Sequence, residues 1–264
     1  MSFYGKNIVI TGASSGIGEA VAKEFLSLGS KVILIARSID KMKDSFKNYP
    51  AENVSFYSFD LTNLDGIEGL ISQIITEHKQ IDILFNNAGI SQFGQFQGSS
   101  LKVINDIMQL DYFSVVYMTK YVLEHMIKNG TGHIVTNTSV AGKIPSRNRT
   151  AYSSAKYALH GFFDSLRIEV ANQNIDITLV APGRVDTGIG ISALTESGKP
   201  YGKNDRGHSN GLSVQSAAKK IIKAIKSKKR EAIISKWSDI ANLGIMLRNF
   251  FPSLYFALAK KIKA

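Results

Sequence analysis

Residues 7–18 read NIVITGASSGIG, a short apolar run followed by glycines at positions 12, 16 and 18. The amphipathic stretch that continues to about Leu28 predicts a helix directly after this turn. Glycine permits a tight turn and a close approach to a ligand, and a helix amino end presents free N–H groups to an anion. The segment therefore predicts a strand, a turn and a helix that bind phosphate. No Gly-Lys-Ser/Thr follows, so the turn is not a P-loop.

Further apolar runs alternate with amphipathic stretches along nearly the whole chain. Together they predict seven strands, at residues 7–11, 31–36, 54–59, 83–86, 133–137, 176–181 and 231–235. Such alternation is typical of a parallel sheet whose right-handed crossovers place helices on both faces. We therefore predict an α/β protein with one doubly wound (Rossmann) domain over residues 1–264 and strand order 3-2-1-4-5-6-7.

The composition bounds the class of protein. The chain has 264 residues, 44% of them hydrophobic, which is enough for one sizeable core. It has no cysteine, and its five histidines lack ligand spacing, so we expect neither a disulfide nor a metal site. The first residues lack the apolar run of a secretory signal, so we expect a cytoplasmic protein.

The positive charge is concentrated near the carboxyl end. The net charge is +11, and residues 215–264 hold twelve Lys and Arg against two acidic residues, so the first 214 residues are almost neutral. Aromatic and basic side chains are not interleaved there as in a surface that stacks bases. We therefore expect no nucleic-acid partner.

Arg37 follows the second predicted strand, where an acidic residue would bind an adenosine ribose 2′-hydroxyl. A guanidinium at this place suits a 2′-phosphate instead. The sequence thus predicts NADP(H) rather than NAD(H). The alternative is that Arg37 is a solvated residue at the start of a helix.

Ser139, Tyr152 and Lys156 are the candidate catalytic residues. Residues 152–169 have apolar positions at helical spacing, so side chains four apart, such as those of Tyr152 and Lys156, share one helix face. Ser139 follows the predicted strand 133–137, and ligands of α/β sheets bind at the carboxyl ends of strands. The three side chains can therefore converge, and together they indicate hydride-transfer chemistry.

With these motifs in order, the chain resembles the short-chain dehydrogenase/reductase family over residues 6 to about 235. The matching segments are Thr11-Gly12-x-x-x-Gly16-x-Gly18, Asn86-Asn87-Ala88-Gly89, Ser139, Tyr152-x-x-x-Lys156 and Pro182-Gly183-x-Val185-x-Thr187. Short pieces, namely 141–145, 193–195 and 201–202, look like the dehydrogenase/reductase member 7/7B branch. That branch is associated with membranes and with lipid-like or steroid carbonyl substrates. The family commonly forms dimers and tetramers, so we expect a homodimer or a homotetramer.

The resemblance also implies roles for individual residues in cofactor binding. Those around the pyrophosphate and adenosine would be Gly12, Ser14, Ser15, Gly16, Ile17 and Gly18. Asp60 and Leu61 would edge the adenine, and Asn87, Ala88 and Gly89 would line the sheet behind the ribose. Pro182, Gly183, Val185 and Thr187 would hold the nicotinamide carboxamide. Two alternatives stay open: Asp60 could cap a strand end, and residues 86–89 could form a turn stabilised by Asx bonding.

The resemblance assigns the proton chemistry to Tyr152. A phenol is a reasonable acid at neutral pH, and the positive charge of Lys156 would stabilise the phenolate, so Tyr152 could act in either direction. Ser139 would hold the substrate oxygen, and Lys156 would also bind the ribose hydroxyls. Asp111 stands where the family usually has an asparagine that supports a water relay. It could keep that water, pair with Lys156, or be only a polar residue inside a helix.

Two segments bear on the substrate and the partners. Residues 188–212, rich in Gly and Ser, are expected to form a lid over a small carbonyl or alcohol substrate. Residues 236–264 form an apolar extension ending in lysines, and neither of its parts reaches the ~20 residues of a spanning helix. It could lie on an anionic membrane, or pack over the substrate pocket or against a second subunit. A catalytically silent sensor or scaffold protein is the alternative to an enzyme.

Overall fold

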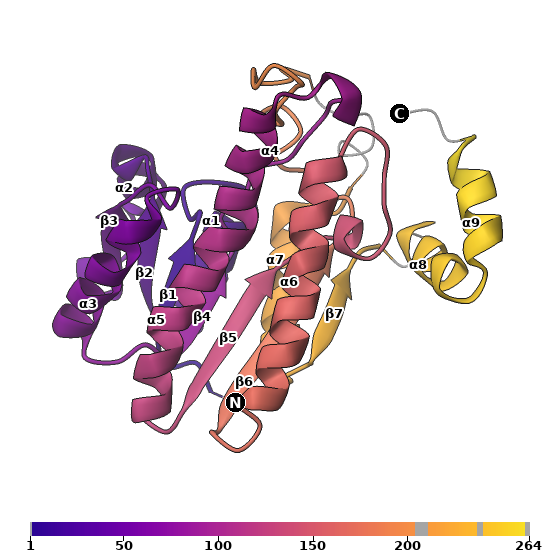
Figure 1. Ribbon diagram of the computed structural model, residues 1–264. Coiled ribbons are helices and arrows are strands. Elements are labelled where there is room, and N and C mark those ends of the chain that lie inside the picture. The colour runs from indigo at the N-terminus through magenta and orange to yellow at the C-terminus, as the bar shows by residue number, and fades with distance from the viewer. Residues whose placement is uncertain (1, 204–210, 237–239, 262–264) are drawn as a thin grey trace.

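The computed structural model describes residues 2–203, 211–236 and 240–261, and its core is a twisted sheet covered by helices on both faces (Figure 1). Within these residues the sheet has seven strands in the order β3-β2-β1-β4-β5-β6-β7. All neighbouring strands are parallel. The strands are β1 (Asn7–Thr11), β2 (Lys31–Ala36), β3 (Val54–Ser58), β4 (Ile83–Asn86), β5 (Gly132–Asn137), β6 (Ile175–Pro182) and β7 (Glu231–Ile234). The predicted fold class and strand order are confirmed.

The helices form two layers. One face of the sheet is covered by α1 (Gly16–Ser27), α2 (Ile39–Phe46) and α7 (Val214–Lys226). The other face is covered by α3 (Ile67–His78), α5 (Ser114–Lys128) and α6 (Thr150–Glu169). The remaining helices are α4 (Leu101–Met108), α8 (Ile240–Phe250) and α9 (Pro252–Ala259).

The strands are buried on both faces, which explains why they appear in the sequence as continuous apolar runs. Along β1, Ile8 and Ile10 point into the layer of α1 and α7, whereas Val9 points into the layer of α3 and α5. Successive residues therefore supply two separate cores on either side of one sheet. This arrangement leaves the strand ends as the place for polar chemistry.

The predicted element boundaries differ from the observed ones by one or two residues. The helix expected from Tyr152 begins at Thr150, and the strand expected over residues 231–235 ends at Ile234. Helix and strand ends fray at this level, so these shifts leave the assignment of elements unchanged.

A π-helical turn, η4 (Gln109–Phe113), joins α4 to α5. A π turn inserts one residue into the helical repeat and rotates the following side chains relative to a regular helix. Asp111 lies in this turn and is fully buried.

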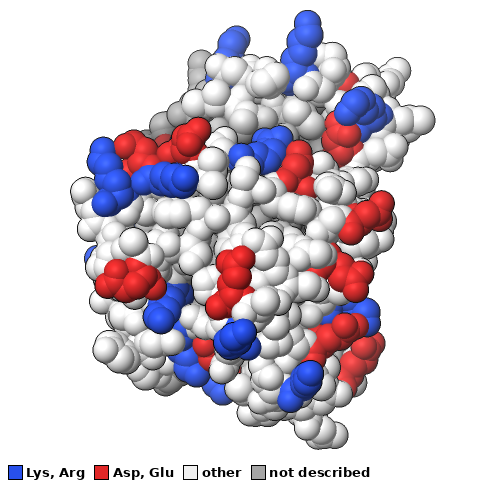
Figure 2. Space-filling model, turned by 90° about the vertical axis from the view of Figure 1, so that its left-hand side faces the viewer, with Lys and Arg blue, Asp and Glu red and all other residues white. Residues whose placement is uncertain are grey.

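The C-terminal helices α8 and α9 lie at the margin of the molecule, beside β7 and α6 (Figure 1). Among the described residues, no helix has both the length and the apolar character needed to cross a membrane. The opposite side of the molecule, around α2, β3 and α3, has acidic and basic side chains intermixed on its surface (Figure 2). That pattern fits the near-neutral charge of the first 214 residues.

Candidate active site

The glycine-rich turn is locked to the end of β4 by hydrogen bonds. The Thr11 hydroxyl accepts the N–H groups of Asn87 (2.9 Å) and Ala88 (3.0 Å). The Asn87 amide donates to the carbonyls of Thr11 (3.1 Å) and Gly12 (3.2 Å). These contacts bring two of the predicted cofactor-binding segments together at the carboxyl edge of the sheet.

Two positions of this turn admit only glycine. Gly12 has φ +65°, and a Cβ there would lie 2.7 Å from the Cα of Ala88. A Cβ on Gly18 would lie 2.4 Å from the carbonyl oxygen of Gly12. Both distances are below van der Waals contact, so a side chain at either position would push the turn off β4 and α1.

The amino end of α1 has the properties of an anion-binding site. Its N-cap residue, Ser15, makes no side-chain capping hydrogen bond, which leaves the first-turn N–H groups without that acceptor. A Cβ built on Gly16 would lie 3.5 Å from a methyl group of Thr187. The segment after β6 therefore lies beside the same turn. Ser14, Ile17 and Gly18 belong to this turn and helix. The donors and the close backbone suit a pyrophosphate.

Arg37 and Asp60 lie at neighbouring strand ends. Arg37 is exposed, and its carbonyl accepts the Ser58 hydroxyl at 3.0 Å. The carboxylate of Asp60 accepts the N–H (3.0 Å) and hydroxyl (2.8 Å) of Thr62. The Thr62 N–H, with Arg37 contributing, lowers the pKa of Asp60. Asp60 thus caps the chain just after β3, as in the strand-end alternative stated for it. Leu61 beside it is buried in the core.

The predicted catalytic side chains come from β5 and α6. Ser139 caps the short helical turn η5 (Val140–Gly142), and its hydroxyl accepts the Ala141 N–H at 3.1 Å. This turn packs on α6, because a Cβ on Gly142 would lie 2.8 Å from the Lys156 carbonyl oxygen. On α6, the Lys156 ammonium lies 5.6 Å from the ring centre of Tyr152. Both side chains are buried.

Lys156 is paired with Asp111. Its Nζ lies 3.1 Å from Asp111 Oδ2, and the two side chains are 4% and 0% exposed. Asp111 Oδ1 accepts the N–H of Ile90 at 2.8 Å. Of the three alternatives stated for Asp111, the structure has the pairing with Lys156.

Gln92 has a structural role that the sequence did not indicate. It is fully buried, and its side-chain oxygen accepts the N–H groups of Ala151 (2.9 Å) and Tyr152 (3.4 Å) at the start of α6. The N-cap residue Arg149 gives no side-chain cap, so Gln92 from the loop after β4 replaces it. No local pattern could have predicted a cap that comes from 59 residues away.

Residues 188–203 of the expected lid lie against the loop after β4. Leu194 forms a β-bridge with Gln92, and its carbonyl accepts the Phe93 N–H at 2.8 Å. The rings of Phe93 and Tyr201 are 4.2 Å apart. Residues 204–210 of the expected lid lie outside the described residues. At the far end, Val185 pairs with Leu212.

The segment after β6 continues toward the same edge. The Gly183 N–H donates to the carbonyl of Ile234 at 3.0 Å, and the Thr187 N–H donates to that of Val185 at 2.9 Å. Pro182 ends β6. The predicted carboxamide-binding residues therefore share the sheet edge with Ser139 and the glycine-rich turn.

The C-terminal extension packs beside the Ser139 turn. Ala241 and Ile245 of α8 contact Val140, with Ile144 at the edge of the cluster. The Tyr255 hydroxyl of α9 donates to the Pro145 carbonyl at 2.8 Å. The extension therefore packs against the residues that follow Ser139. Its contact with a substrate, a membrane or a second subunit stays a prediction.

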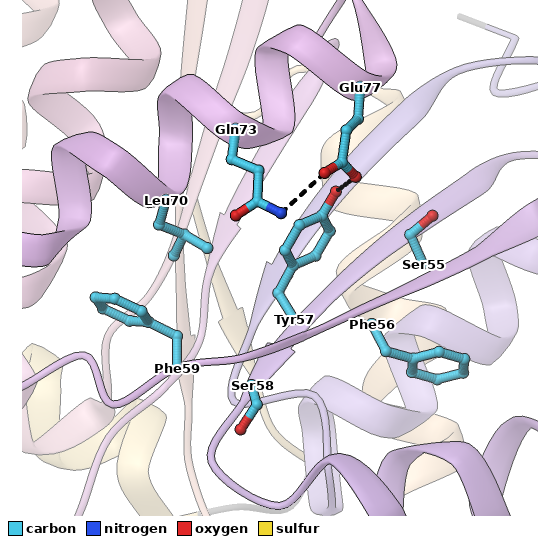
Figure 3. A pocket seen from close by; sticks show the side chains of 8 residues that line it. All are labelled: Ser55, Phe56, Tyr57, Ser58, Phe59, Leu70, Gln73 and Glu77. Carbon is cyan, nitrogen blue, oxygen red and sulfur yellow. Dashed lines mark hydrogen bonds between the residues drawn. The ribbon is translucent and has the colours of Figure 1, made fainter.

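Two hollows lie away from this site. One, of about 560 Å³, runs along β3 and α3, where Tyr57 donates a hydrogen bond to Glu77 (Figure 3). Burial, together with Glu77, raises the pKa of Tyr57. The other, of about 660 Å³, lies near Lys6 and Asp176 at the amino ends of the strands. None of the predicted site residues lines either hollow.

Comparison with known proteins agrees with this fold and motif set. The family model described as short chain dehydrogenase matches residues 6–197. The chain is 38% identical to "Dehydrogenase/reductase SDR family protein 7-like" of Drosophila melanogaster, over 97% of this chain and 80% of that protein. It is 34% identical to "Dehydrogenase/reductase SDR family member 7B" of Xenopus laevis, over 95% of this chain and 80% of that protein. The chain belongs to the short-chain dehydrogenase/reductase family, a family of oxidoreductases.

Solved structures share the fold at lower identity. A short-chain dehydrogenase of Streptomyces avermitilis matches with a TM-score of 0.81 and 24% identity, over 97% of this chain and 96% of that chain. A Burkholderia phymatum enzyme in complex with NAD gives 0.84 and 22%, over 96% of both chains. A Burkholderia cenocepacia enzyme in complex with NADP gives 0.81 and 19%, over 98% and 99%.

Proposed function

We propose that this protein is an NADP(H)-dependent oxidoreductase that transfers hydride between nicotinamide and a ketone or secondary alcohol. The observation that carries the proposal is the pair Tyr152 and Lys156, buried side by side on α6. The turn that begins at Ser139 packs against the same helix. Membership of an oxidoreductase family supports the same reaction class.

The residues present fit a dinucleotide. The glycine-rich turn and the amino end of α1 would hold the pyrophosphate, and the segment from Pro182 to Thr187 would hold the carboxamide. Asn87, Ala88 and Gly89 would line the ribose side, with Asp60 and Leu61 near the adenine. When bound, the cofactor supplies or accepts the hydride at the carbonyl carbon.

The chain itself must manage the proton on the substrate oxygen. In reduction, the O–H bond of Tyr152 breaks and its proton moves to the carbonyl oxygen, which leaves an alcohol and a tyrosinate. The Ser139 hydroxyl donates a hydrogen bond to the same oxygen as negative charge develops there. The Lys156 ammonium stabilises the tyrosinate until solvent returns the proton.

Arg37 favours NADP(H) over NAD(H). Its side chain is exposed at the end of β2, on the edge where the adenosine ribose would lie, and it can meet a 2′-phosphate with paired N–H donors. The fold alone does not decide between the two cofactors, because related structures are in complex with NAD in one case and NADP in another.

The surroundings favour an apolar substrate, lipid-like or steroid-like. Val140 and Ile144 next to Ser139 are covered by α8, and Phe93 pairs with Tyr201 where the lid meets the loop after β4. Residues 188–212 act as the lid in this proposal, within a single catalytic domain over residues 1–264. Such a site excludes water from the reacting carbonyl.

A screen of NADPH consumption tests the proposal. Ketosteroids, 3-keto lipids, acyl-dihydroxyacetone phosphates and small aldehydes would be compared by kcat/KM. We expect turnover, with the large apolar ketones preferred over the small aldehydes. NADPH binding without turnover of any carbonyl would instead favour the silent sensor or scaffold.

The C-terminal helices offer a surface for an anionic lipid membrane. Exposed apolar side chains gather on α8, on α9 and at the residue between them, namely Leu243, Met246, Phe250, Phe251, Leu254, Phe256 and Leu258. Lys260 and Lys261 follow them and are exposed, so burial and charge would act together on an anionic surface. We propose peripheral contact of a cytoplasmic protein with a membrane through this surface, hereafter the C-terminal apolar surface.

We also propose a homodimer or homotetramer, as expected from the family. Light scattering of the purified protein measures the mass directly. A mass of one chain across the working concentration range would rule out this assembly.

A further inference from the structure

The ion pair between Asp111 and Lys156 is the feature of the site that the family resemblance does not account for. Both side chains are buried, and apart from the Lys156 ammonium, Asp111 Oδ2 meets no hydrogen-bond donor among the described residues. A buried ammonium paired with a carboxylate exerts a weaker net field on its neighbours than a buried ammonium beside a neutral amide, because the two charges of the pair offset each other.

The backbone holds the carboxylate in place. Asp111 lies in the π-helical turn η4, and its Oδ1 is anchored by the Ile90 N–H at 2.8 Å. Gly89 leaves room for it, since a Cβ on Gly89 would lie 3.1 Å from Oδ2. Both carboxylate oxygens thus face donors, one N–H and one ammonium, which favours the ionised form.

The groups around the pair are few. From α6, Lys156 and Tyr152 are the titratable groups that act on Asp111 and on each other. The loop after β4 contributes the Ile90 N–H, and α4 contributes the apolar Val103 and Ile107 to the cluster around Tyr152. The Lys156 ammonium, 5.6 Å from the ring centre of Tyr152, and the Asp111 carboxylate paired with it are therefore charges that act beside the Tyr152 phenol.

The two pKa values are tied to this contact. Burial raises the pKa of Asp111, and the Lys156 ammonium with the Ile90 N–H opposes the rise. Burial alone would lower the pKa of Lys156, but the Asp111 carboxylate, with Tyr152, raises it above its ordinary value. The carboxylate thus keeps Lys156 protonated while cancelling much of its charge.

We propose that Asp111 is a positioning residue that offsets the charge of Lys156, so that the Tyr152 phenol gives up its proton less readily than it would beside an unpaired ammonium. This inference rests on the proposed function, because it concerns the residue that donates the proton there. A phenol beside a compensated cation ionises less readily than one beside a free cation. Compared with a site in which Lys156 is unpaired, reduction, which consumes the phenol proton, should extend to higher pH, and alcohol oxidation, which needs the phenolate, should begin at higher pH.

A titration of tyrosinate absorbance in the cofactor-free protein tests the inference. Tyr152 is isolated by subtracting the Tyr152→Phe variant in the wild-type and Asp111→Asn backgrounds. We expect Asp111→Asn, which keeps an acceptor for Ile90, to bring the Tyr152 tyrosinate signal to lower pH by about one unit. With an active ketone, the alkaline limb of the reduction profile should move the same way. An unchanged or higher titration pH would overturn the proposal.

Asp106→Asn is the matched control, because it removes the same charge from the exposed ion pair with Lys102 on α4. It should leave the Tyr152 titration unchanged. A merely structural role of Asp111 would lower stability without moving the titration. The titration needs neither cofactor nor substrate, so it can give the expected shift even if the protein reduces none of the carbonyl compounds tested. Failure of this inference and failure of the proposed function are therefore distinguishable.

Asp111→Asn leaves a buried ammonium unpaired and could unfold the protein. The double variant Asp111→Asn/Lys156→Met removes both charges together and avoids that cost. If the charges cancel at Tyr152, the double variant should titrate at nearly the wild-type pH. A clearly higher titration pH would contradict the inference, because it would mean that Lys156 acts uncompensated in the wild type.

Discussion

Single residues at the sheet edge set the geometry of the site. Gly12 and Gly18 leave the space through which the turn after β1 contacts Ala88 and α1. Asn87 then ties this turn to the neighbouring strand. The glycines of this motif therefore allow close packing inside the protein, and in the proposed function they also leave room for a phosphate group outside it.

The cofactor preference depends on Arg37. We predict that the wild-type protein has a higher kcat/KM with NADPH than with NADH. Arg37→Asp should lower the NADPH value by about 10- to 100-fold, because a charge-assisted contact to the 2′-phosphate contributes about 1.5–3 kcal/mol. Lys43→Asp makes a similar charge change at an exposed residue of α2 and serves as the control. It should have little effect on the NADPH value. A wild-type preference for NADH would contradict the assignment.

His133 makes the protein sensitive to acid. It is buried in β5 with Nε2 2.8 Å from the Thr178 hydroxyl, and burial lowers its pKa to about 4. Between about pH 6.5 and 4, His133 therefore binds a proton in the unfolded chain but not in the folded protein. The free energy of unfolding falls as the pH falls through this window. The contribution is complete above pH 6.5 and is lost toward pH 4.

Urea unfolding at pH 7.5 and pH 5 measures this effect. We expect the loss of unfolding free energy between the two pH values to be smaller in His133→Gln than in the wild type by about 2 kcal/mol. His125→Gln, at a less buried histidine, should give a smaller difference. Equal losses in His133→Gln and wild type would mean that His133 does not titrate as inferred.

At the scale of elements, the site depends on contacts between the start of α6 and loops from distant parts of the chain. The start of α6 relies on Gln92 for its cap, and Gln92 pairs with Leu194, so the loop after β4 and the segment around Leu194 both affect the position of Tyr152. The π-helical turn between α4 and α5 turns Asp111 toward α6. Neither arrangement follows from periodicity, because each depends on a contact between distant parts of the chain.

The C-terminal apolar surface makes an element-scale prediction. The wild-type protein should co-sediment with vesicles that contain anionic lipid, more strongly than with zwitterionic vesicles and less strongly at high salt. The double variant Phe250→Ser/Phe251→Ser should lose most of this binding, since both side chains are exposed, at 72% and 60%. Ile168→Ser, at an exposed apolar residue of α6, is the control and should bind as the wild type does.

Absence of vesicle binding by the wild-type protein would overturn the membrane assignment. If the double variant at Phe250 and Phe251 instead halves the mass measured by light scattering, the surface belongs to an interface between two copies of the chain. The two outcomes are distinguished in the same preparation.

At the scale of the whole molecule, the sequence contained most of the fold. Parallel strands are buried on both faces, so each appears as an apolar run, and the crossover rules then fix the strand order. The motif residues could be placed at one sheet edge for the same reason. The contact between Asp111 and Lys156 remained one of several alternatives, because it depends on the π-helical turn and on Ile90.

The packing of the C-terminal helices could not be predicted from the sequence alone. Their apolar residues predicted burial somewhere, and the structure buries Ala241, Ile245 and Tyr255 against the Ser139 side of the molecule. The remaining apolar residues stay exposed. The hydrophobic pattern of this segment therefore includes both buried and exposed apolar residues, and only tertiary packing determines which of them are buried.

The central claim is that Tyr152 supplies the proton for carbonyl reduction. Tyr152→Phe tests it most directly, with NADPH binding followed by fluorescence and reduction followed with the best ketone of the screen. We predict that the variant still binds NADPH and loses at least about 100-fold in kcat, the usual contribution of a general acid. A Tyr152→Phe protein that binds NADPH and keeps most of its reductase activity would contradict the account.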